Sequence, residues 1–224
     1  MDITLTDVLE FVGTYAFAIS GIRLAAGKKF DWFGAFIIGL ITAVGGGTIR
    51  DMMLGITPFW MENSIYFIET FVAFITVLLF SKYLVSQHST LFLFDTLGLA
   101  LFTIVGIEKT LPLGFPLWVA IIMGTITGSA GGVLRDVFIN EVPLIFRKEI
   151  YAMACVFGGL IYGICMWIGL DEQFTSLISG AGVFLLRYLA DAKHISLPTL
   201  SDPLAHEKET TNSDSPSGNT PSVS

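Results

Sequence analysis

The fold is decided by two short stretches, "ITAVGGGTIRDMMLG" at residues 41–55 and "ITGSAGGVLRDVFIN" at residues 126–140. Each contains a run of small residues, and in each an Arg-Asp pair begins three positions after the last glycine. When residues 13–58 are compared with residues 98–143 without gaps, 16 of the 46 positions are identical. A shared apolar composition does not place Gly-Gly-x-x-Arg-Asp and a later proline in register. The sequence therefore indicates an internal duplication with an offset of 85 residues.

The composition favours a lipid environment. Apolar residues make up 53% of the 224 residues and charged residues only 14%, whereas a soluble domain carries about 25% charged residues. Apolar runs long enough to cross a hydrocarbon core of about 30 Å occur at approximately 6–26, 33–54, 64–84, 91–108, 117–139, 150–169 and 174–190. The connections between these runs are short. We therefore expect an all-α polytopic membrane protein with seven transmembrane helices.

The duplicated unit contains three predicted spans. Because three is odd, the second copy enters the membrane upside down relative to the first, as in the inverted repeats of many transport proteins. The seventh span lies outside the repeat. The predicted organisation is a first three-helix repeat at 1–89, a second, inverted repeat at 90–170, a seventh transmembrane helix at 171–191 and a disordered cytoplasmic tail at 192–224. The tail is rich in Ser, Thr, Pro and Asp, a composition that cannot bury enough apolar surface to fold.

Basic residues are distributed unequally between the two predicted membrane faces. Those on one face are Arg23, Lys28, Lys29, Lys82, Arg147, Lys148, Arg187 and Lys193. The connections on the other face contain Lys109 and several acids. Since Lys and Arg are enriched in cytoplasmic connections, we expect the N-terminus outside the cell and the C-terminus in the cytoplasm.

The glycine runs fall in the middle span of each copy. Glycine lowers helix stability by about 1 kcal/mol relative to alanine, so we expect both helices to be broken or bent there. Irregular backbone in a membrane is tolerated where it lines a wet cavity, and the two bends would then frame a site or pore. The alternative is that the glycines form small-x-x-x-small faces for close helix packing. The candidate positions are Gly45, Gly46, Gly47, Thr48, Gly128, Ser129, Gly131 and Gly132.

Charged groups lie beside both runs. Arg50–Asp51 and Arg135–Asp136 are either structural ion pairs, each Arg with its own neighbour or with the Asp of the other repeat, or gates at opposite ends of a pore. The hydroxyls of Thr48 and Ser129 could replace part of the water shell of a cation. Alternatively, they bond to carbonyls of their own helices.

Several function classes are excluded or disfavoured. A net charge of −7 argues against a nucleic-acid partner. The sequence has no phosphate-binding loop, no nucleophile elbow, no zinc-protease motif and no Cys-x-x-Cys. Cys155 and Cys165 are ten residues apart on one predicted helix, too far for a disulfide, and we expect two buried thiols. No enzyme activity, cofactor or metal is therefore predicted.

The doubled three-span unit, with Gly-Gly-Gly-x-x-Arg-Asp in span 2 and Gly-Gly-x-x-Arg-Asp in span 5, resembles the prokaryotic TRIC (trimeric intracellular cation) channels. The resemblance covers about residues 5–190. It implies a homotrimer in the bacterial inner membrane with one pore per subunit, lined by glycine-kinked spans 2 and 5. It also implies permeation of monovalent cations, chiefly potassium, with sodium as a second candidate.

Some bacterial proteins with the same duplicated domain are described as glycine transporters. The alternative function is therefore transport of a small zwitterion such as glycine, whose carboxylate and ammonium groups could be held at a broken helix.

Overall fold

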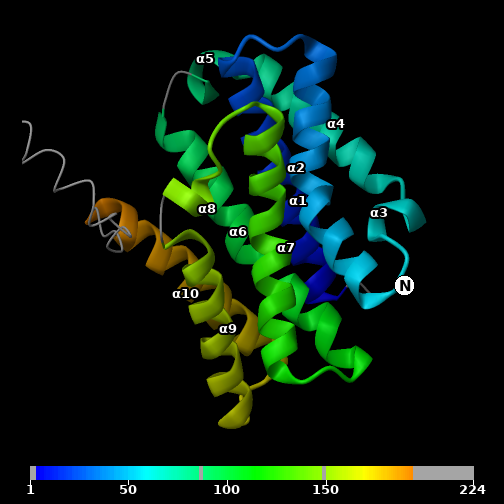
Figure 1. The fold of residues 1–224 in the computed structure, drawn as a ribbon, viewed down its shortest axis with the longest axis vertical. Helices are drawn as coiled ribbons and strands as arrows, with labels where there is room; N and C mark the ends of the chain where they lie inside the picture. Colours follow the sequence, from blue (N-terminus) through cyan, green and yellow to red (C-terminus); the bar gives the residue numbers. More distant parts are fainter. Residues whose placement is uncertain (1–3, 86–87, 148–149, 194–224) are drawn as a thin grey trace, which may run out of the picture.

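The computed structural model describes residues 4–85, 88–147 and 150–193. Over these residues the chain is helical and contains no strand (Figure 1). The long helices are α1 (Leu5–Gly27), α2 (Trp32–Leu54), α4 (Ile65–Leu79), α6 (His88–Thr110), α7 (Leu117–Phe138), α9 (Tyr151–Trp167) and α10 (Glu172–Ala192). Short segments connect them, namely α3 (Phe59–Glu62), α5 (Ser81–Leu84), η1 (Leu111–Leu113) and α8 (Leu144–Arg147). The all-α prediction is confirmed, and the predicted tail from residue 194 onward lies outside the described residues.

The surface of the molecule is apolar and part of its interior is polar. Helices α1, α2 and α7 and the segment Ser89–Leu113 have the length and hydropathy of membrane spans, and α4 and α9 are shorter apolar helices. On α10, large apolar side chains such as Phe174 and Leu185 are exposed, whereas Ser179 and Arg187 are buried. Exposed apolar patches of this extent are foreign to soluble monomers. The pattern fits a bundle surrounded by lipid.

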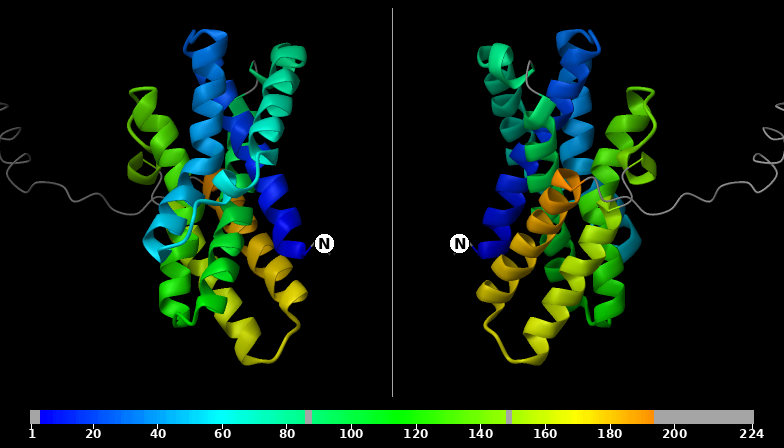
Figure 2. Two further views of the ribbon diagram at one scale, coloured as in Figure 1. Left: turned by 90° about the vertical axis from the view of Figure 1, so that its right-hand side faces the viewer. Right: turned by 90° about the vertical axis from the view of Figure 1, so that its left-hand side faces the viewer.

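The two copies of the repeat consist of α1, α2 and α4, and of α6, α7 and α9. In Figure 1, α2 runs from the top of the view toward the bottom, and α7 runs from the bottom toward the top. The two copies are therefore oppositely oriented, as three spans per copy predict. Helix α10 packs against α9 and α6 beside the second copy (Figure 2).

Glycines allow the first two helices of each copy to pack at backbone distance. A Cβ atom on Gly21 of α1 would lie 2.9 Å from the Cα of Gly39 on α2. A Cβ atom on Gly106 of α6 would lie 2.7 Å from the Cα of Gly124 on α7. The two pairs are equivalent under the 85-residue offset, so both copies use the same small-residue contact.

The two copies meet where α2 crosses α7. A Cβ atom on Gly46 would collide with the Thr127 carbonyl oxygen, and one on Gly131 would collide with the Thr42 carbonyl oxygen. The two contacts are equivalent under the repeat, because Gly46 corresponds to Gly131 and Thr42 corresponds to Thr127 at the 85-residue offset. The pseudo-two-fold axis therefore passes through this crossing.

Both middle helices are continuous, so the expectation of a break is wrong, whereas a bend at the glycines stays a prediction. Residues 45–47 in α2 and 128–132 in α7 are α-helical. The helical hydrogen-bond pattern tolerates the glycines because tertiary contacts outweigh their low helix propensity. What the glycines provide is space for a neighbouring backbone rather than an interruption.

We expect Gly131→Ala to lower the free energy of unfolding by about 1–3 kcal/mol, because the added methyl group must displace the Thr42 backbone. Gly27→Ala is the matched control, since no atom lies within 4 Å of a Cβ at Gly27. Thermal unfolding of both variants in detergent measures the difference. Equal transition temperatures would contradict the role of the crossing.

Candidate functional site

Two clusters of buried ionisable side chains belong to the two copies. The first-repeat cluster consists of Glu10, Arg50, Asp51, Tyr66 and Lys109. The second-repeat cluster consists of Asp95, Arg135, Asp136, Tyr151 and Arg187. Four members of one cluster have an equivalent in the other at the 85-residue offset. Only Lys109, from α6, and Arg187, from α10, have none.

In each copy the Arg-Asp pair joins the end of the middle helix to the short helix that follows it. The Arg50 Nε atom lies 2.7 Å from Asp51 Oδ1, and the backbone N–H of Phe59 donates to Asp51 Oδ2 at 2.9 Å. This is the pairing of each Arg with its own neighbour, one of the alternatives that the sequence leaves open.

The second copy repeats this arrangement. The Arg135 Nε atom lies 2.8 Å from Asp136 Oδ1, and the N–H of Leu144 donates to Asp136 Oδ2 at 2.9 Å. Both Arg side chains are fully buried. The carboxylates therefore balance a charge that would otherwise be intolerable at this depth.

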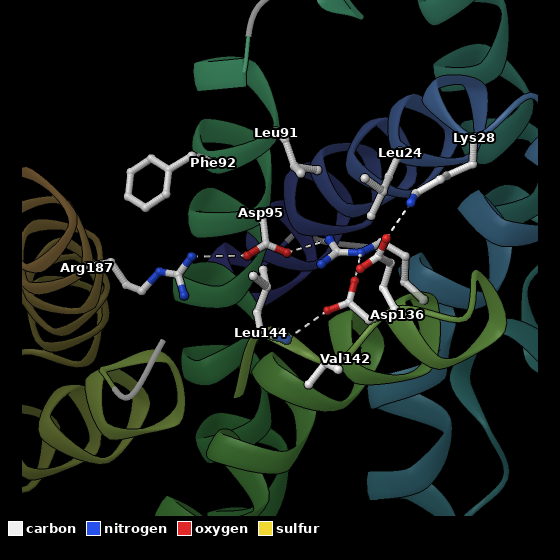
Figure 3. A pocket seen from close by; sticks show the side chains of 11 residues that line it. Leu24, Lys28, Leu91, Phe92, Asp95, Asp136, Val142, Leu144 and Arg187 are labelled. Atoms are coloured by element: carbon white, nitrogen blue, oxygen red, sulfur yellow. Dashed lines mark hydrogen bonds and ion pairs between the residues drawn. The ribbon is translucent and has the colours of Figure 1, made fainter. Parts of the chain in front are cut away.

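Asp95 bridges two arginines in the second-repeat cluster. Its Oδ1 accepts from Arg135 Nη1 at 2.6 Å, and its Oδ2 lies 3.2 Å from Arg187 Nη2 (Figure 3). The Arg135 Nη1 atom also donates to Ser20 Oγ of α1 at 2.7 Å. The Arg187 guanidinium stacks 4.4 Å from the centre of the Tyr151 ring. This network ties α10 to both repeats.

A cavity of about 310 Å³ opens beside this cluster. Its lining combines the ionisable groups Asp95, Arg135, Asp136 and Arg187 with apolar side chains such as Leu24 and Val142. Lys28, from the end of α1, and Glu141, from the loop after α7, also line it and form an ion pair with each other (Figure 3).

Hydrogen-bonding capacity remains in the buried part of this site. Within the described part of the chain, the Arg135 Nη2 and Tyr151 hydroxyl groups have no hydrogen-bond partner. Buried polar groups are normally satisfied. A buried group of this kind is commonly satisfied by an ordered water.

The first-repeat cluster is built around Glu10. Lys109 Nζ lies 2.6 Å and 2.8 Å from the two carboxylate oxygens of Glu10, and the Tyr66 hydroxyl donates to Glu10 Oε2 at 2.9 Å. The Arg50 Nη2 atom is 3.9 Å from Glu10 Oε1. Because Lys109 lies at the end of a predicted span, the sequence predicts that its amine extends to the membrane surface. The structure instead directs this amine inward, with 27% of the side chain exposed.

The predicted hydroxyls bond to their own helices. Thr48 Oγ1 donates to the Val44 carbonyl at 2.7 Å, and Ser129 Oγ donates to the Thr125 carbonyl at 2.6 Å. Thr48 Oγ1 also accepts from the indole of Trp60. Both hydroxyls thus adopt the helix-bonded alternative that the sequence leaves open.

The remaining predicted glycines lie against side chains or backbone rather than together in one open space. A Cβ on Gly45 would meet Leu134, one on Gly47 would meet Phe59, and one on Gly128 would meet Thr103. Gly132 faces the Tyr151 hydroxyl.

The repeat in the sequence pairs Glu10 with Asp95 and predicts that they attract cations at pore mouths or cap helices at the interface. Sequence reasoning missed three other members of the clusters. Tyr66 and Tyr151 are separated by the 85-residue offset, and extending the repeat comparison past residue 58 would have found them. Arg187 lies outside the repeat, so no pattern in the sequence connects it with Asp95.

Comparisons with known proteins give one family. A family model described as "Glycine transporter" matches residues 7–82 and again residues 92–167, which are separated by the same offset of 85. A "UPF0126 membrane protein" of Vibrio cholerae is 39% identical over 204 residues, covering 90% of this chain and 85% of the relative. The "UPF0126 inner membrane protein YadS" of Escherichia coli K12 is 37% identical over 196 residues, covering 86% of this chain and 95% of the relative.

Solved structures agree in fold. The TRIC trimeric intracellular cation channel orthologue from Rhodobacter sphaeroides has a TM-score of 0.82 at 33% identity, covering 86% of this chain and 100% of that chain. A second TRIC cation channel structure has a TM-score of 0.79 at 32% identity, covering 89% of this chain and 98% of that chain.

We expect Asp95→Asn to lower the free energy of unfolding by about 3–5 kcal/mol, because it leaves two buried arginines short of a counter-charge. Glu141→Gln, which alters the exposed pair with Lys28, should lower it by at most about 1 kcal/mol. Chemical unfolding monitored by tryptophan fluorescence compares the two. A larger effect of Glu141→Gln would contradict the assignment of Asp95 as the bridge.

Proposed function

The chain belongs to the glycine transporter family of membrane proteins and shares the fold of the TRIC cation channels, and from this premise we propose that it is a channel for monovalent cations. The permeant ion we propose is potassium. Each subunit of a homotrimer would contain its own pore. The observation that carries the proposal is the pair of equivalent charged clusters, one from each of two oppositely oriented repeats that meet where α2 crosses α7.

The charge of the clusters supports weak ion binding. Each contains two carboxylates and two cationic side chains, so each formal charge is zero. Conduction requires that an ion be held loosely enough to leave. Carboxylates already paired with Arg or Lys attract a cation without trapping it, which suits passive permeation.

We place the ion path along α2 and α7. The cavity beside Asp95 would form its wide end, and the crossing at Gly46 and Gly131 its narrow part. The backbones touch at this crossing, so opening would require α2 and α7 to bend at their glycine runs. The proposed pore residues are Gly45, Gly46, Gly47, Thr48, Gly128, Ser129, Gly131 and Gly132, and the charged pairs are Arg50–Asp51 and Arg135–Asp136.

The proposed setting is the inner membrane, with the N-terminus outside and the second-repeat cluster near the cytoplasm. The predicted division into 1–89, 90–170, 171–191 and 192–224 is part of this proposal, and the twofold match of the family model supports its first two units.

Planar-bilayer recording of the purified protein under potassium, sodium and chloride gradients tests the proposal. We expect unitary cation currents, with Ser129→Ala changing conductance or selectivity because it removes an oxygen near the crossing. Gly132→Leu should abolish the current, either by occluding the path or by preventing folding, because its side chain would collide with the Tyr151 hydroxyl. Gly27→Leu, at an open position, is the control. Unchanged currents in both test variants would remove α7 from the pore.

A second candidate function is transport of a small zwitterion such as glycine. The observation that favours it is the cavity of about 310 Å³, whose lining brings the cationic Arg135 and Arg187 together with the carboxylates of Asp95 and Asp136.

Uptake of labelled glycine into liposomes separates the two candidates. A channel should show cation currents and no saturable glycine uptake. Saturable uptake without unitary currents would replace the channel by the transporter, and Asp136→Asn should then weaken uptake.

A further inference from the structure

A buried carboxyl group without an ion-pair partner lies between α1 and α4, outside the ion pairs described above. Glu69 of α4 is 3% exposed, and its carboxylate lies near the backbone of Tyr15 on α1, but neither oxygen has a well-aligned hydrogen bond or an ion pair within the described residues. Thr14 of α1 is fully buried, and its hydroxyl likewise has no partner there. Buried polar groups are rarely left unsatisfied, so both require an explanation.

Two cross-helix hydrogen bonds locate these groups. The Tyr66 hydroxyl of α4 donates to Glu10 of α1, and the hydroxyls of Tyr15 on α1 and Thr76 on α4 are 2.8 Å apart. Along α1, Thr14 lies between the two bonds, and along α4, Glu69 does. The Glu10 carboxylate is close enough to act electrostatically on Glu69. Glu69 therefore lies next to Glu10, on the side of the first-repeat cluster that faces α4.

The second repeat shows that the fold does not need these polar groups. At the 85-residue offset, Glu69 corresponds to Ala154 and Thr14 corresponds to Leu99. Both equivalents are fully buried. The same helix contact is thus apolar in one copy and contains a carboxyl and a hydroxyl in the other, although burying a polar group is unfavourable.

The surroundings of Glu69 do not supply a direct counter-charge. The basic side chains of the first-repeat cluster, Arg50 and Lys109, face Asp51 and Glu10. Titratable groups at buried or half-buried positions on the elements that pack against α4, and on α4 itself, are Glu10, Tyr15, Arg23, Arg50, Asp51 and Tyr66. Arg23 lies nine residues beyond Thr14 along α1, and its Nε atom donates to the Leu84 carbonyl and to Thr90 Oγ1. The titratable side chains of α3 and α5, Glu62, Lys82 and Tyr83, are exposed.

We propose that Glu69 is a proton-binding site specific to the first repeat, in which the neutral carboxyl group lies beside Thr14 and behind Glu10. Binding converts the carboxylate and one proton from the aqueous phase into a carboxylic acid, with no other bond changed. Loss of that proton adds one negative charge behind the first-repeat cluster. On the proposed channel function, the protonation state of Glu69 thus sets cation conductance.

Infrared difference spectroscopy of the full-length protein in lipid, between acidic and alkaline buffer, tests the binding site without any transport assay. We expect a carbonyl stretching band of a protonated carboxylic acid that is lost in Glu69→Gln and retained in the control Glu62→Gln, whose side chain is exposed. Absence of the band from the parent protein, or its survival in Glu69→Gln, would overturn the proposal.

A second variant guards against a folding defect. Thr14→Leu/Glu69→Ala copies the second repeat and should unfold at a higher temperature than the parent, because it removes two unsatisfied polar groups. Its cation flux into liposomes should lose the pH dependence of the parent flux. If the parent flux is independent of pH, or if the double variant keeps the pH dependence, the claim that Glu69 protonation sets cation conductance is wrong. If the parent shows no flux at any pH, the proposed channel function is wrong. The infrared band then still tests proton binding at Glu69 independently.

Discussion

The backbone contact between α2 and α7 is the constraint on which the rest of the structure depends. Gly46 and Gly131 each lie against a carbonyl of the other helix, and the two contacts are related by the pseudo-two-fold axis. Since the helices touch at backbone distance, the ends of both middle helices diverge from one shared point. The clusters at Arg50 and Arg135 are therefore held at fixed positions relative to the crossing.

Buried charge is arranged around that point as matched pairs. In each copy one carboxylate serves both the adjacent arginine and the N-terminus of the following short helix. An ion pair in a low-dielectric interior is tolerable only when its remaining groups are also hydrogen-bonded. The Arg-Asp motif is thus a structural element first, and any role in permeation is added to a pair that the fold already needs.

The two copies differ at residues that have no equivalent at the 85-residue offset. Some of these residues lie outside the repeat, and others lie within it. Arg187 of α10 reaches Asp95, and Lys109 of α6 reaches the equivalent Glu10. Each acid of the first helices thereby gains a second cation, but from different parts of the chain. Glu69 and Thr14 lie at the contact between α1 and α4, and the equivalent positions in the other copy are the apolar residues Ala154 and Leu99. An inverted repeat supplies the symmetric frame, and such single residues make its two ends chemically different.

The sequence alone determined the all-helical class, the 85-residue repeat and the opposite orientation of its copies, because apolar length, glycine spacing and an odd number of spans are local or periodic properties. It did not determine the state of the middle helices: glycine propensity predicts a break or a bend, and packing at Gly46 and Gly131 keeps the helices continuous. The sequence also does not show that Arg187 pairs with Asp95, or that Glu69 is buried without an ion-pair partner. Those features depend on which side chains meet across helices, and only the tertiary structure decides that.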